Sequence, residues 1–363
     1  MSPTPRPATP AIAIVLATYN RAKPLEHLLR GLERQTAPRD DWEVVVVVDG
    51  SKDDTEAVLT RSVQKGALPL QFLVQENAGQ SVARHNGILR TSAEHVIVID
   101  DDMEVCPEFV AEHLAASRKA PGKVVVIGKV VPEKTFMKKP LFTAVGEHHL
   151  LLLHARLESG EQAPTATVFV TQNVSFPRAM YLEQGGFDAS LRLDEDRELG
   201  IRLERAGAVF VFAPKAWAIH HSDVGSYGKW SRRHYEYGKY ALQIWEKHGE
   251  SPLLHPLRNY VEGSRLNRAL VSIVCPGDLR SKVAESALRW MGNALQRLAI
   301  FEPAIYTHKA IQAVRYHQGL RDAVGSWGTL RRMGRQYAAS PNRPGKPTGS
   351  GPTYEGAHHS RGA

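Results

Sequence analysis

Short hydrophobic runs alternate with segments of helical periodicity over the first third of the chain. Runs rich in β-branched residues predict strands at 12–16, 44–48, 70–74, 96–99 and 124–131. Between them, apolar residues recur at helical spacing, as Leu25, Leu28, Leu29 and Leu32 do, and predict intervening helices, including 81–91 and 107–118. Continuously apolar strands alternating with helices are typical of a parallel sheet that is covered on both faces.

The rest of the chain is less regular before it becomes helical. We expect loops with one or two helices over 134–167, helices at 178–184 and 195–206, and extended segments at 209–212 and 217–221. From 227 to about 336 the spacing of apolar residues predicts helices, and the aromatic side chains there suit either a groove that binds sugar rings or packing between helices: Trp230, Tyr235, Tyr237, Tyr240 and Trp245.

These patterns predict an α/β fold with a mostly parallel central sheet and a helical C-terminal extension. We expect the α/β domain at 11–225, with one half at 11–131 and a second at 132–225, and the helical region at 226–337. Polar and Pro- or Gly-rich composition predicts a disordered lead-in at 1–10 and a disordered tail at 338–363.

Polar residues follow each of the first four predicted strands. Ligands of open parallel sheets bind beyond the carboxyl ends of the strands. We therefore expect one ligand site formed by Thr18, Tyr19, Asn20, Asp49, Asn77, Asp100, Asp101 and Asp102. Neither a GxGxxG nor a GxxxxGK[ST] sequence occurs in this region, so neither a dinucleotide fingerprint nor a P-loop supports a different interpretation.

The acidic triplet 100–102 ends the fourth hydrophobic run abruptly. Adjacent carboxylates repel one another unless a cation or a proton neutralises them. Mg²⁺ is typically held by one or two carboxylates together with substrate phosphates, so the triplet favours a metal that binds a nucleotide diphosphate. The alternative from these residues alone is a solvated acidic turn.

The charge and composition of the chain limit the partners and the cellular location that we expect for it. The net charge is +8, and cationic residues accumulate late in the chain, for example at Arg331, Arg332 and Arg335. Such a surface suits anionic lipid or polymer, or is simply solvated. Cys106 and Cys275 have no metal-binding spacing, and no apolar run approaches the length of about 20 residues that a membrane span needs. We expect a cytoplasmic protein, with peripheral contact to the inner face of the membrane through the basic helical region as the further possibility, and no nucleic-acid partner.

Five short motifs in order make the chain similar to the inverting glycosyltransferases of family 2, which have the GT-A fold. The resemblance runs from about 12 to 221. Its motifs are ATYNR at 17–21, VDGSKDDT at 48–55, NAG at 77–79 with Ala83, Arg84 and Gly87, DDD at 100–102, and GFD at 186–188 followed by Glu195, Asp196 and Arg202.

The resemblance implies a role for each motif. Asp49 would bind the base or ribose, Asp100 the ribose or a metal-bound water, and Asp102 a Mn²⁺ or Mg²⁺ ion. One histidine of the pair 220–221 would complete the coordination, and His220 is preferred over His221. Asp196 would be the base that deprotonates the acceptor hydroxyl. Arg84 would pair with phosphate or carboxylate, and the acceptor side would comprise Asn173, Glu195 and Arg202.

Some positions depart from the family pattern. Val48 stands where many relatives carry an Asp, His85 where Asn is frequent, and Asp54 where Gly is frequent. These differences leave the identity of the donor open. The resemblance implies a hexosyltransferase that moves a sugar from a nucleotide-diphosphate donor, with UDP preferred, to a glycan or lipid-linked acceptor in cell-surface polysaccharide synthesis.

Two other functions remain open from the residues alone. A nucleotidyltransferase that forms sugar nucleotides uses a similar sheet, but that class usually carries a glycine-rich basic loop where this chain has TYNR at 18–21. A nucleotide-binding scaffold without catalytic activity is the second alternative. The presence of both Asp102 and Asp196 argues against it.

Overall fold

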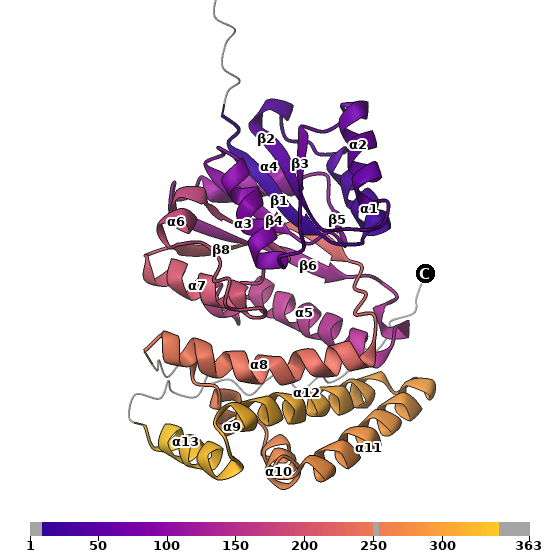
Figure 1. The fold of residues 1–363 in the computed structure, drawn as a ribbon, viewed down its shortest axis with the longest axis vertical. Coiled ribbons are helices and arrows are strands. Elements are labelled where there is room, and N and C mark those ends of the chain that lie inside the picture. The colour runs from indigo at the N-terminus through magenta and orange to yellow at the C-terminus, as the bar shows by residue number, and fades with distance from the viewer. Residues whose placement is uncertain (1–8, 250–253, 341–363) are drawn as a thin grey trace, which may run out of the picture.

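A computed structural model describes residues 9–249 and 254–340 of the chain. One sheet of eight strands, in the order β3-β2-β1-β4-β7-β6-β8-β5, forms the upper part of the molecule in Figure 1, and helices form the lower part. The predicted α/β fold with a C-terminal helical region is confirmed. The predicted lead-in and tail fall mainly on 1–8 and 341–363, which lie outside the described residues.

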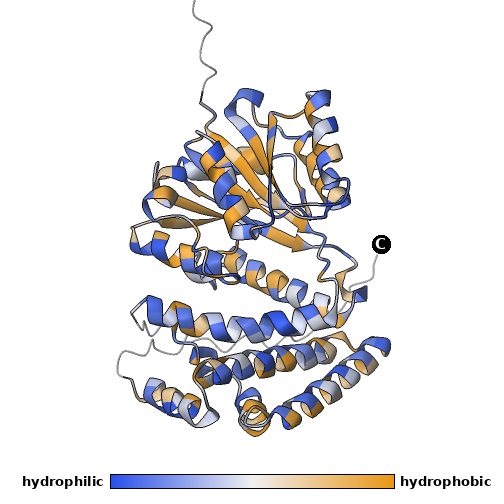
Figure 2. Ribbon diagram, in the orientation of Figure 1, coloured by the Kyte–Doolittle hydropathy of each residue, from blue (hydrophilic) through white to orange (hydrophobic). Residues whose placement is uncertain are grey.

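The first four predicted strands are present and parallel. They are β1 (Ile12–Thr18), β2 (Trp42–Asp49), β3 (Leu70–Gln75) and β4 (His95–Ile99). The β-branched residues of β1, β2 and β4 are almost fully buried because helices cover both faces of the sheet, whereas Val74 on the edge strand β3 is half-exposed, and these strands are strongly hydrophobic in Figure 2.

The second half of the sheet is mixed. β6 (Val124–Pro132) and β8 (Val209–His220) run parallel to each other, whereas β7 (Asn173–Pro177) is antiparallel to both of its neighbours, β4 and β6. The short strand β5 (Met103–Val105) pairs antiparallel with the end of β8. The sequence pattern missed β5 and β7, and it divided β8 into two pieces, 209–212 and 217–221, which lie on either side of the register shift in the pairing with β6.

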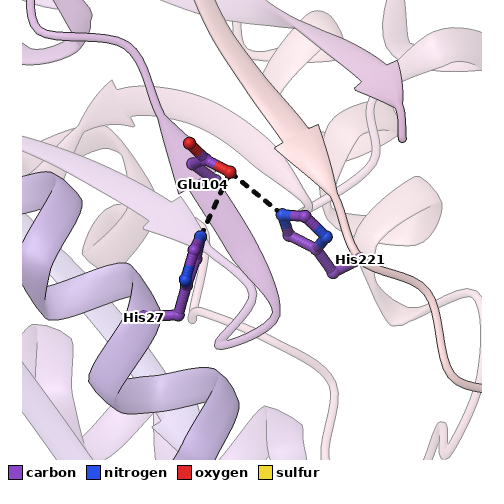
Figure 3. Close-up of side chains that lie close together, drawn as sticks. All are labelled: His27, Glu104 and His221. Carbon is purple, nitrogen blue, oxygen red and sulfur yellow. Dashed lines mark hydrogen bonds and ion pairs between the residues drawn. The ribbon is translucent and has the colours of Figure 1, made fainter. Parts of the chain in front are cut away.

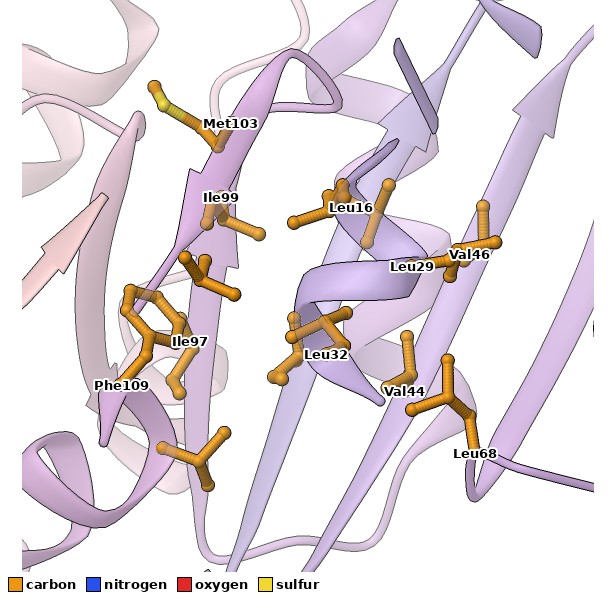
Figure 4. Close-up of a cluster of buried hydrophobic side chains, with 14 of the residues drawn as sticks. Leu16, Leu29, Leu32, Val44, Val46, Leu68, Ile97, Ile99, Met103 and Phe109 are labelled. Atoms are coloured by element: carbon orange, nitrogen blue, oxygen red, sulfur yellow. The ribbon is translucent and has the colours of Figure 1, made fainter. Parts of the chain in front are cut away.

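Two groups of helices cover the sheet. α1 (Ala22–Leu32), α2 (Thr55–Lys65) and α4 (Phe109–Ser117) pack on one face, and Figure 4 shows Leu29, Leu32 and Phe109 against strand residues there. On the other face lie α3 (Gln80–Arg90), α6 (Arg178–Glu183) and α7 (Glu195–Arg205). Full burial of each such leucine or phenylalanine contributes about 1.5–3 kcal/mol.

The region 134–167, predicted as loops with one or two helices, is dominated by one long helix, α5 (Leu141–Ser159). Helix α5 lies between the sheet and the C-terminal helices in Figure 1. Short 3-10 turns at Phe136–Lys138 and Ala166–Val168 flank it, and a third such turn, Arg39–Asp41, precedes β2.

The C-terminal region contains α8 (Tyr227–Lys247), α9 (Arg258–Glu262), α10 (Arg265–Val274), α11 (Asp278–Arg297), α12 (Phe301–Ala323) and α13 (Trp327–Ala339). Helices α8 and α12 cross closely at two glycines. A Cβ atom on Gly238 would lie 2.0 Å from the Tyr316 carbonyl oxygen, and one on Gly319 would lie 1.8 Å from the Tyr235 carbonyl oxygen. Only glycine fits these positions, so the two glycines allow α8 and α12 to pack closely.

Candidate active site

A cavity of about 650 Å³, a volume typical of small-molecule sites, lies at the carboxyl ends of the first strands. Its lining brings together most of the predicted ligand residues with further groups from α8 and from the segment after β8. The predicted residues in the lining are Thr18, Tyr19, Asp49, Asn77, Asp100, Asp101, Asp102 and His220. Among the described residues, Asn20, Asn173, Arg84, Glu195, Asp196 and Arg202 are not part of that lining.

Asp49 organises the floor of the cavity. It is almost fully buried, and its carboxylate accepts hydrogen bonds from the backbone N–H groups of Ala78 (2.8 Å) and Gly79 (2.9 Å) and from Gln75 Nε2 (2.8 Å). Asn77 donates to the Asp49 carbonyl oxygen at 2.9 Å. Asp49 therefore holds the loop after β3 against the end of β2, and its predicted contact with a base or ribose stays a prediction.

Asn20 braces the loop after β1 rather than the cavity itself. Its backbone φ of 53° lies in the left-handed region, which asparagine tolerates better than most residues. Its N–H donates to Ser51 Oγ at 2.9 Å, and its Oδ1 accepts from the Lys52 N–H at 2.7 Å. These two bonds tie the first loop to the second and fix the position of Tyr19, which is half-exposed at the cavity.

Asp102 presents one paired and one unpaired carboxylate oxygen. Its Oδ2 accepts a hydrogen bond from Arg21 Nη1 at 2.7 Å, whereas the buried Oδ1 has no hydrogen-bond partner and lies 3.6 Å from His220 Nε2. Burial opposes ionisation, but the interactions with His220 and Arg21 outweigh it and hold the pKa of Asp102 at about 2. An ionised, buried oxygen without a partner beside an imidazole nitrogen suits a divalent cation.

His220 is oriented by a second carboxylate. Its Nδ1 lies 2.7 Å from Glu147 Oε1 on α5, an arrangement that typically supports a metal-ligating imidazole. Burial disfavours the charged ring, yet Asp102 and Glu147 together raise the pKa of His220 to about 10. His221, the alternative named from the sequence, points to Glu104 and Glu133 instead. Of the two histidines, only His220 is in the cavity lining.

Asp100 and Asp101 complete the triplet in different surroundings. Asp100 pairs with Arg84 and accepts from Gln80 Nε2 at 3.2 Å, while burial raises its pKa. Burial also raises the pKa of Asp101 to about 7, although Arg21 lies 3.4 Å from its Oδ1. The pKa is therefore raised at Asp100 and Asp101 and lowered at Asp102, so the three carboxylates do not lose their protons together.

Arg84 links the triplet to the acceptor-side acids. Its guanidinium bonds Asp100 and donates to Thr171 Oγ1 at 2.8 Å, and its Nη1 lies 3.6 Å from Glu195 Oε1. The backbone N–H of Thr171 in turn donates to Asp196 Oδ2 at 3.4 Å. Asp196 therefore contacts Thr171, the residue that precedes the cavity-lining Gln172. Asp196 is not itself in the lining.

Asp196 has the environment of a carboxylate with raised basicity. Burial raises its pKa, with the charge of Asp100 adding to the effect. The neighbouring acids are perturbed in the same direction, since burial raises the pKa of Glu195 to about 7 and that of Asp194 to about 6. A base poised nearer neutral pH than an ordinary aspartate is what removal of a hydroxyl proton requires.

Two residues assigned to the acceptor side have structural partners instead. Arg202 donates to both oxygens of the fully buried Glu198, at 3.0 Å each from its Nε atom, and bonds the carbonyl groups of Gln184 and Gly186. This network is a buried ion pair that anchors α7, so the structure gives Arg202 no part in lining the cavity.

Asn173 is likewise buried, and its side-chain amide bonds groups in the protein interior. Its Nδ2 donates to the carbonyl oxygens of Lys129 (3.1 Å) and Ala216 (2.9 Å), and its Oδ1 accepts from His113 Nε2 at 2.9 Å. With 1% of its surface exposed, Asn173 cannot touch an acceptor. It joins β7 to β6 and β8 at the point where the sheet becomes mixed.

Sequence reasoning missed several residues of the cavity. Lys229 and Arg233, one helical turn apart on α8, bring two cations to the lining, which also includes Gln172, Ser222 and Asp223. Their basic i, i+4 spacing was visible in the sequence. Nothing there placed α8 beside the acidic triplet, because that contact depends on the folding of the C-terminal helices.

Comparison with known proteins shows a similarity to one family. The family model described as "Glycosyl transferase family 2" matches residues 13–179. A validoxylamine A glucosyltransferase of Streptomyces hygroscopicus subsp. jinggangensis is 32% identical over 244 residues, which are 58% of this chain and 55% of that protein. A dolichyl-phosphate beta-glucosyltransferase of Trichomonas vaginalis is 28% identical over 164 residues, or 40% of this chain and 49% of that protein. The chain spans about half the length of the curated relatives it matches.

Solved structures show the same fold. A mannosyltransferase from Pyrobaculum calidifontis in complex with GDP-Man and Mn²⁺ superposes with a TM-score of 0.58 at 20% identity, covering 87% of this chain and 89% of that chain. Residues 1-349 of TarS from S. aureus give a TM-score of 0.52 at 17% identity, covering 90% and 91%. The sheet with its C-terminal helices is therefore the GT-A fold.

Proposed function

We propose that this chain, which carries a glycosyltransferase domain of family 2, transfers a sugar from a nucleoside diphosphate to an acceptor hydroxyl. The observation that carries the proposal is the unpaired, buried Oδ1 of Asp102, 3.6 Å from His220 Nε2, in a cavity at the carboxyl ends of parallel strands.

Asp102 and His220 would hold a Mn²⁺ or Mg²⁺ ion, which when bound supplies a Lewis acid that stabilises the departing diphosphate. Lys229 and Arg233 add positive charge to the lining of the same cavity. Two cations spaced one turn apart suit a diphosphate, whose oxygens accept charge-assisted hydrogen bonds. In support, the solved mannosyltransferase of the same fold contains GDP-Man and Mn²⁺.

Asp196 would act as the base that removes the proton from the attacking hydroxyl. A single displacement from the face opposite the leaving group inverts the anomeric carbon. The raised pKa of Asp196 supports this role, as does its connection to the cavity wall through Thr171. Arg84 would keep the base and Asp100 in a fixed relation through its bonds to Asp100 and Thr171.

The acceptor would approach from the side of α8. A second cavity of about 390 Å³ lies beside the acidic segment, and its lining combines carboxylate, cationic and aromatic side chains, including Asp194, Tyr237, Tyr260, Arg268 and Lys309. Aromatic faces pack on sugar rings, and cations pair with phosphate, so this lining suits a glycan or a lipid-linked acceptor. Cell-surface polysaccharide synthesis is the setting we propose for this reaction.

The test is release of nucleoside diphosphate from a panel of UDP-, GDP- and dTDP-sugars, with Mn²⁺ or Mg²⁺ and with EDTA. We expect metal-dependent release from one donor, with UDP-sugars the first choice, and loss of that release in Asp102→Ala. A donor-binding assay runs in parallel, because hydrolysis without an acceptor is slow. Absence of both release and nucleotide binding would reject the proposal in favour of a scaffold.

We further propose that α10 and α11 contact an anionic membrane surface. No helix in the described segments 9–249 and 254–340 is long and apolar enough to cross a membrane. Large apolar side chains are nevertheless strongly exposed on these two helices: Leu266 (79%), Ile273 (65%), Leu279 (76%), Val283 (61%) and Trp290 (75%). Exposed cations flank them, namely Arg265, Arg280, Lys282, Arg289 and Arg297. Apolar anchors surrounded by cations suit a bilayer of anionic lipid.

Co-sedimentation with vesicles tests the membrane contact. We expect binding to vesicles that contain phosphatidylglycerol, little binding to phosphatidylcholine alone, and loss of binding in the Leu279→Asp, Trp290→Asp double variant. Leu89→Asp, at an exposed leucine on α3, is the matched control and should bind as the wild type does. If the patch instead joins two copies of the chain, the wild type will not bind vesicles. The double variant will then have a smaller sedimentation coefficient than the wild type.

A further inference from the structure

Two histidines and a glutamate from three separate elements meet on the surface of the sheet domain. His27 comes from α1, Glu104 from β5, and His221 follows the last residue of β8 (Figure 3). The Nε2 atoms of His27 and His221 lie 3.1 and 3.2 Å from the same oxygen, Glu104 Oε2. One ligand atom from each of the three residues lies within 4.8 Å of the others.

The donor atoms of this cluster converge as metal ligands do. In Figure 3 both imidazole rings point their outer nitrogen toward the glutamate. Tetrahedral zinc sites with Zn–N bonds of about 2.0–2.1 Å require donor atoms at roughly these separations. The pairing of β5 with β8 fixes Glu104 opposite Ile219, so the backbone sets the approach of Glu104 to His221.

A further carboxylate prepares His221 for coordination. Its Nδ1 lies 3.2 Å from Glu133 Oε2, and Glu133 is itself held by Lys139 at 3.1 Å. When Nδ1 carries the proton and donates it to Glu133, the lone pair on Nε2 is free to bind a cation. Metal-ligating histidines almost always have such a partner on the second nitrogen.

We propose that His27, Glu104 and His221 bind a transition-metal ion of the Zn²⁺ type, at a site separate from that of Asp102 and His220. Two imidazoles and one carboxylate favour Zn²⁺, Co²⁺ or Ni²⁺, whereas sites rich in carboxylate and water suit Mg²⁺ and Mn²⁺. Three protein ligands leave the fourth position to water, and the half-exposed His27 side chain gives solvent access.

The ion ties α1 and β5 to the segment that carries His220. The His221 N–H already donates to the Asp102 carbonyl oxygen at 2.9 Å, so this short segment is attached to the acidic triplet through its backbone. A bound ion adds a second attachment on the other side of His221. We therefore expect Zn²⁺ to stabilise the fold even when no nucleotide is present.

The experiment is calorimetric titration of Zn²⁺ into full-length, metal-free protein prepared without a histidine tag. Visible absorption of the Co²⁺ derivative serves as the second readout, because a tetrahedral nitrogen and oxygen site has a characteristic spectrum. We expect the wild type to bind one Zn²⁺ at this site, and His27→Gln and Glu104→Gln to bind it at least tenfold more weakly. Glu133→Gln should lose about 10–100-fold, as loss of such a partner usually does.

Two controls separate this site from other sources of metal binding. Glu26→Gln changes the carboxylate next to His27, which pairs with Arg30 rather than with the cluster, and should leave the Zn²⁺ affinity unchanged. Asp102→Ala should also retain it, because Asp102 belongs to the other site. Equal Zn²⁺ affinity in the wild type and His27→Gln, or loss of binding in Asp102→Ala alone, would overturn the proposal. His27 is at an exposed helix position, so His27→Gln should fold as the wild type does.

Discussion

Arg84 places its Nη1 atom 3.6 Å from Oε1 of Glu195, and this contact joins the acidic triplet 100–102 to the acids at the start of α7. Only 2% of the Arg84 side chain is exposed. The same guanidinium bonds Asp100 and Thr171, so one cation faces two acids, Asp100 after β4 and Glu195 at the start of α7, that are far apart in sequence. Asp100 and Glu195 depend on Arg84 for charge compensation, whereas Arg21 pairs with Asp101 and Asp102.

We therefore expect Arg84→Leu to destabilise the protein strongly. Removing one partner of a buried ion pair leaves uncompensated charge and costs about 3–5 kcal/mol in the free energy of unfolding. Denaturant unfolding followed by circular dichroism measures the loss. Arg90→Leu, on the same helix at an exposed position, should change the free energy by less than about 0.5 kcal/mol. Equal effects of the two substitutions would show that Arg84 is not the central counter-ion.

Asp102→Ala should abolish metal-dependent donor binding. The substitution removes both the unpaired Oδ1 and the oxygen that Arg21 bonds, while His220 alone is a weak site for Mn²⁺. Titration of a UDP-sugar with Mn²⁺ and with EDTA measures the difference. We expect the residual binding of Asp102→Ala to be insensitive to EDTA, and Mn²⁺-dependent binding by this variant would exclude Asp102 as a ligand.

Asp196→Asn should bind the donor but fail to transfer the sugar. The amide preserves the size of the side chain, and its oxygen still accepts the Thr171 N–H, but it cannot take a proton. Loss of a general base typically costs about 10²–10⁴-fold in rate. Donor affinity and the rate of transfer, measured on the same preparation, separate binding from chemistry. Transfer at the wild-type rate would remove Asp196 as the base.

Whether the position of a site residue can be predicted from sequence depends on which partners hold that residue in the folded protein. Asp49 and Asp102 are predictable because they end hydrophobic strands, and parallel strands deliver their ends to one edge. The roles of Asn173 and Arg202 are not, since their partners are backbone carbonyls and Glu198 inside folded elements. The strand β7 was also not predictable. Its five residues are all buried, so the sequence lacks the alternation of apolar and polar residues that marks many antiparallel strands.

The pH profile should report the base. Asp196 is faced by Arg84 from α3, by Asp100 after β4 and by Tyr237 from α8, and burial gives it a pKa above the ordinary 3.8. Only the ionised form takes the proton, so kcat/KM should fall as pH decreases through that raised pKa. Initial rates with saturating metal measure the acidic limb. A limb at pH 4 or below would contradict the raised pKa.

A last prediction concerns the position where the sheet changes from parallel to mixed. Gly128 lies at the register shift between β6 and β8, and a Cβ atom there would fall 2.3 Å from both amide atoms of Asn173. Asn173 cannot move aside, because it bonds Lys129, Ala216 and His113 at once. We expect Gly128→Ala to cost at least about 1–3 kcal/mol, the usual price of overpacking a close-packed interior.

Gly146 provides the opposite case within the same chain. It lies on the exposed side of α5, and a Cβ atom would meet nothing within 4 Å. Because alanine restricts the unfolded chain more than glycine and favours helix, Gly146→Ala should stabilise the protein by about 0.4–1 kcal/mol. Melting temperatures of the two variants should therefore move in opposite directions. A Gly128→Ala protein as stable as the wild type would mean that Asn173 does not hold β7 in place. Other contacts would then fix the position of Gln172, which directly precedes β7.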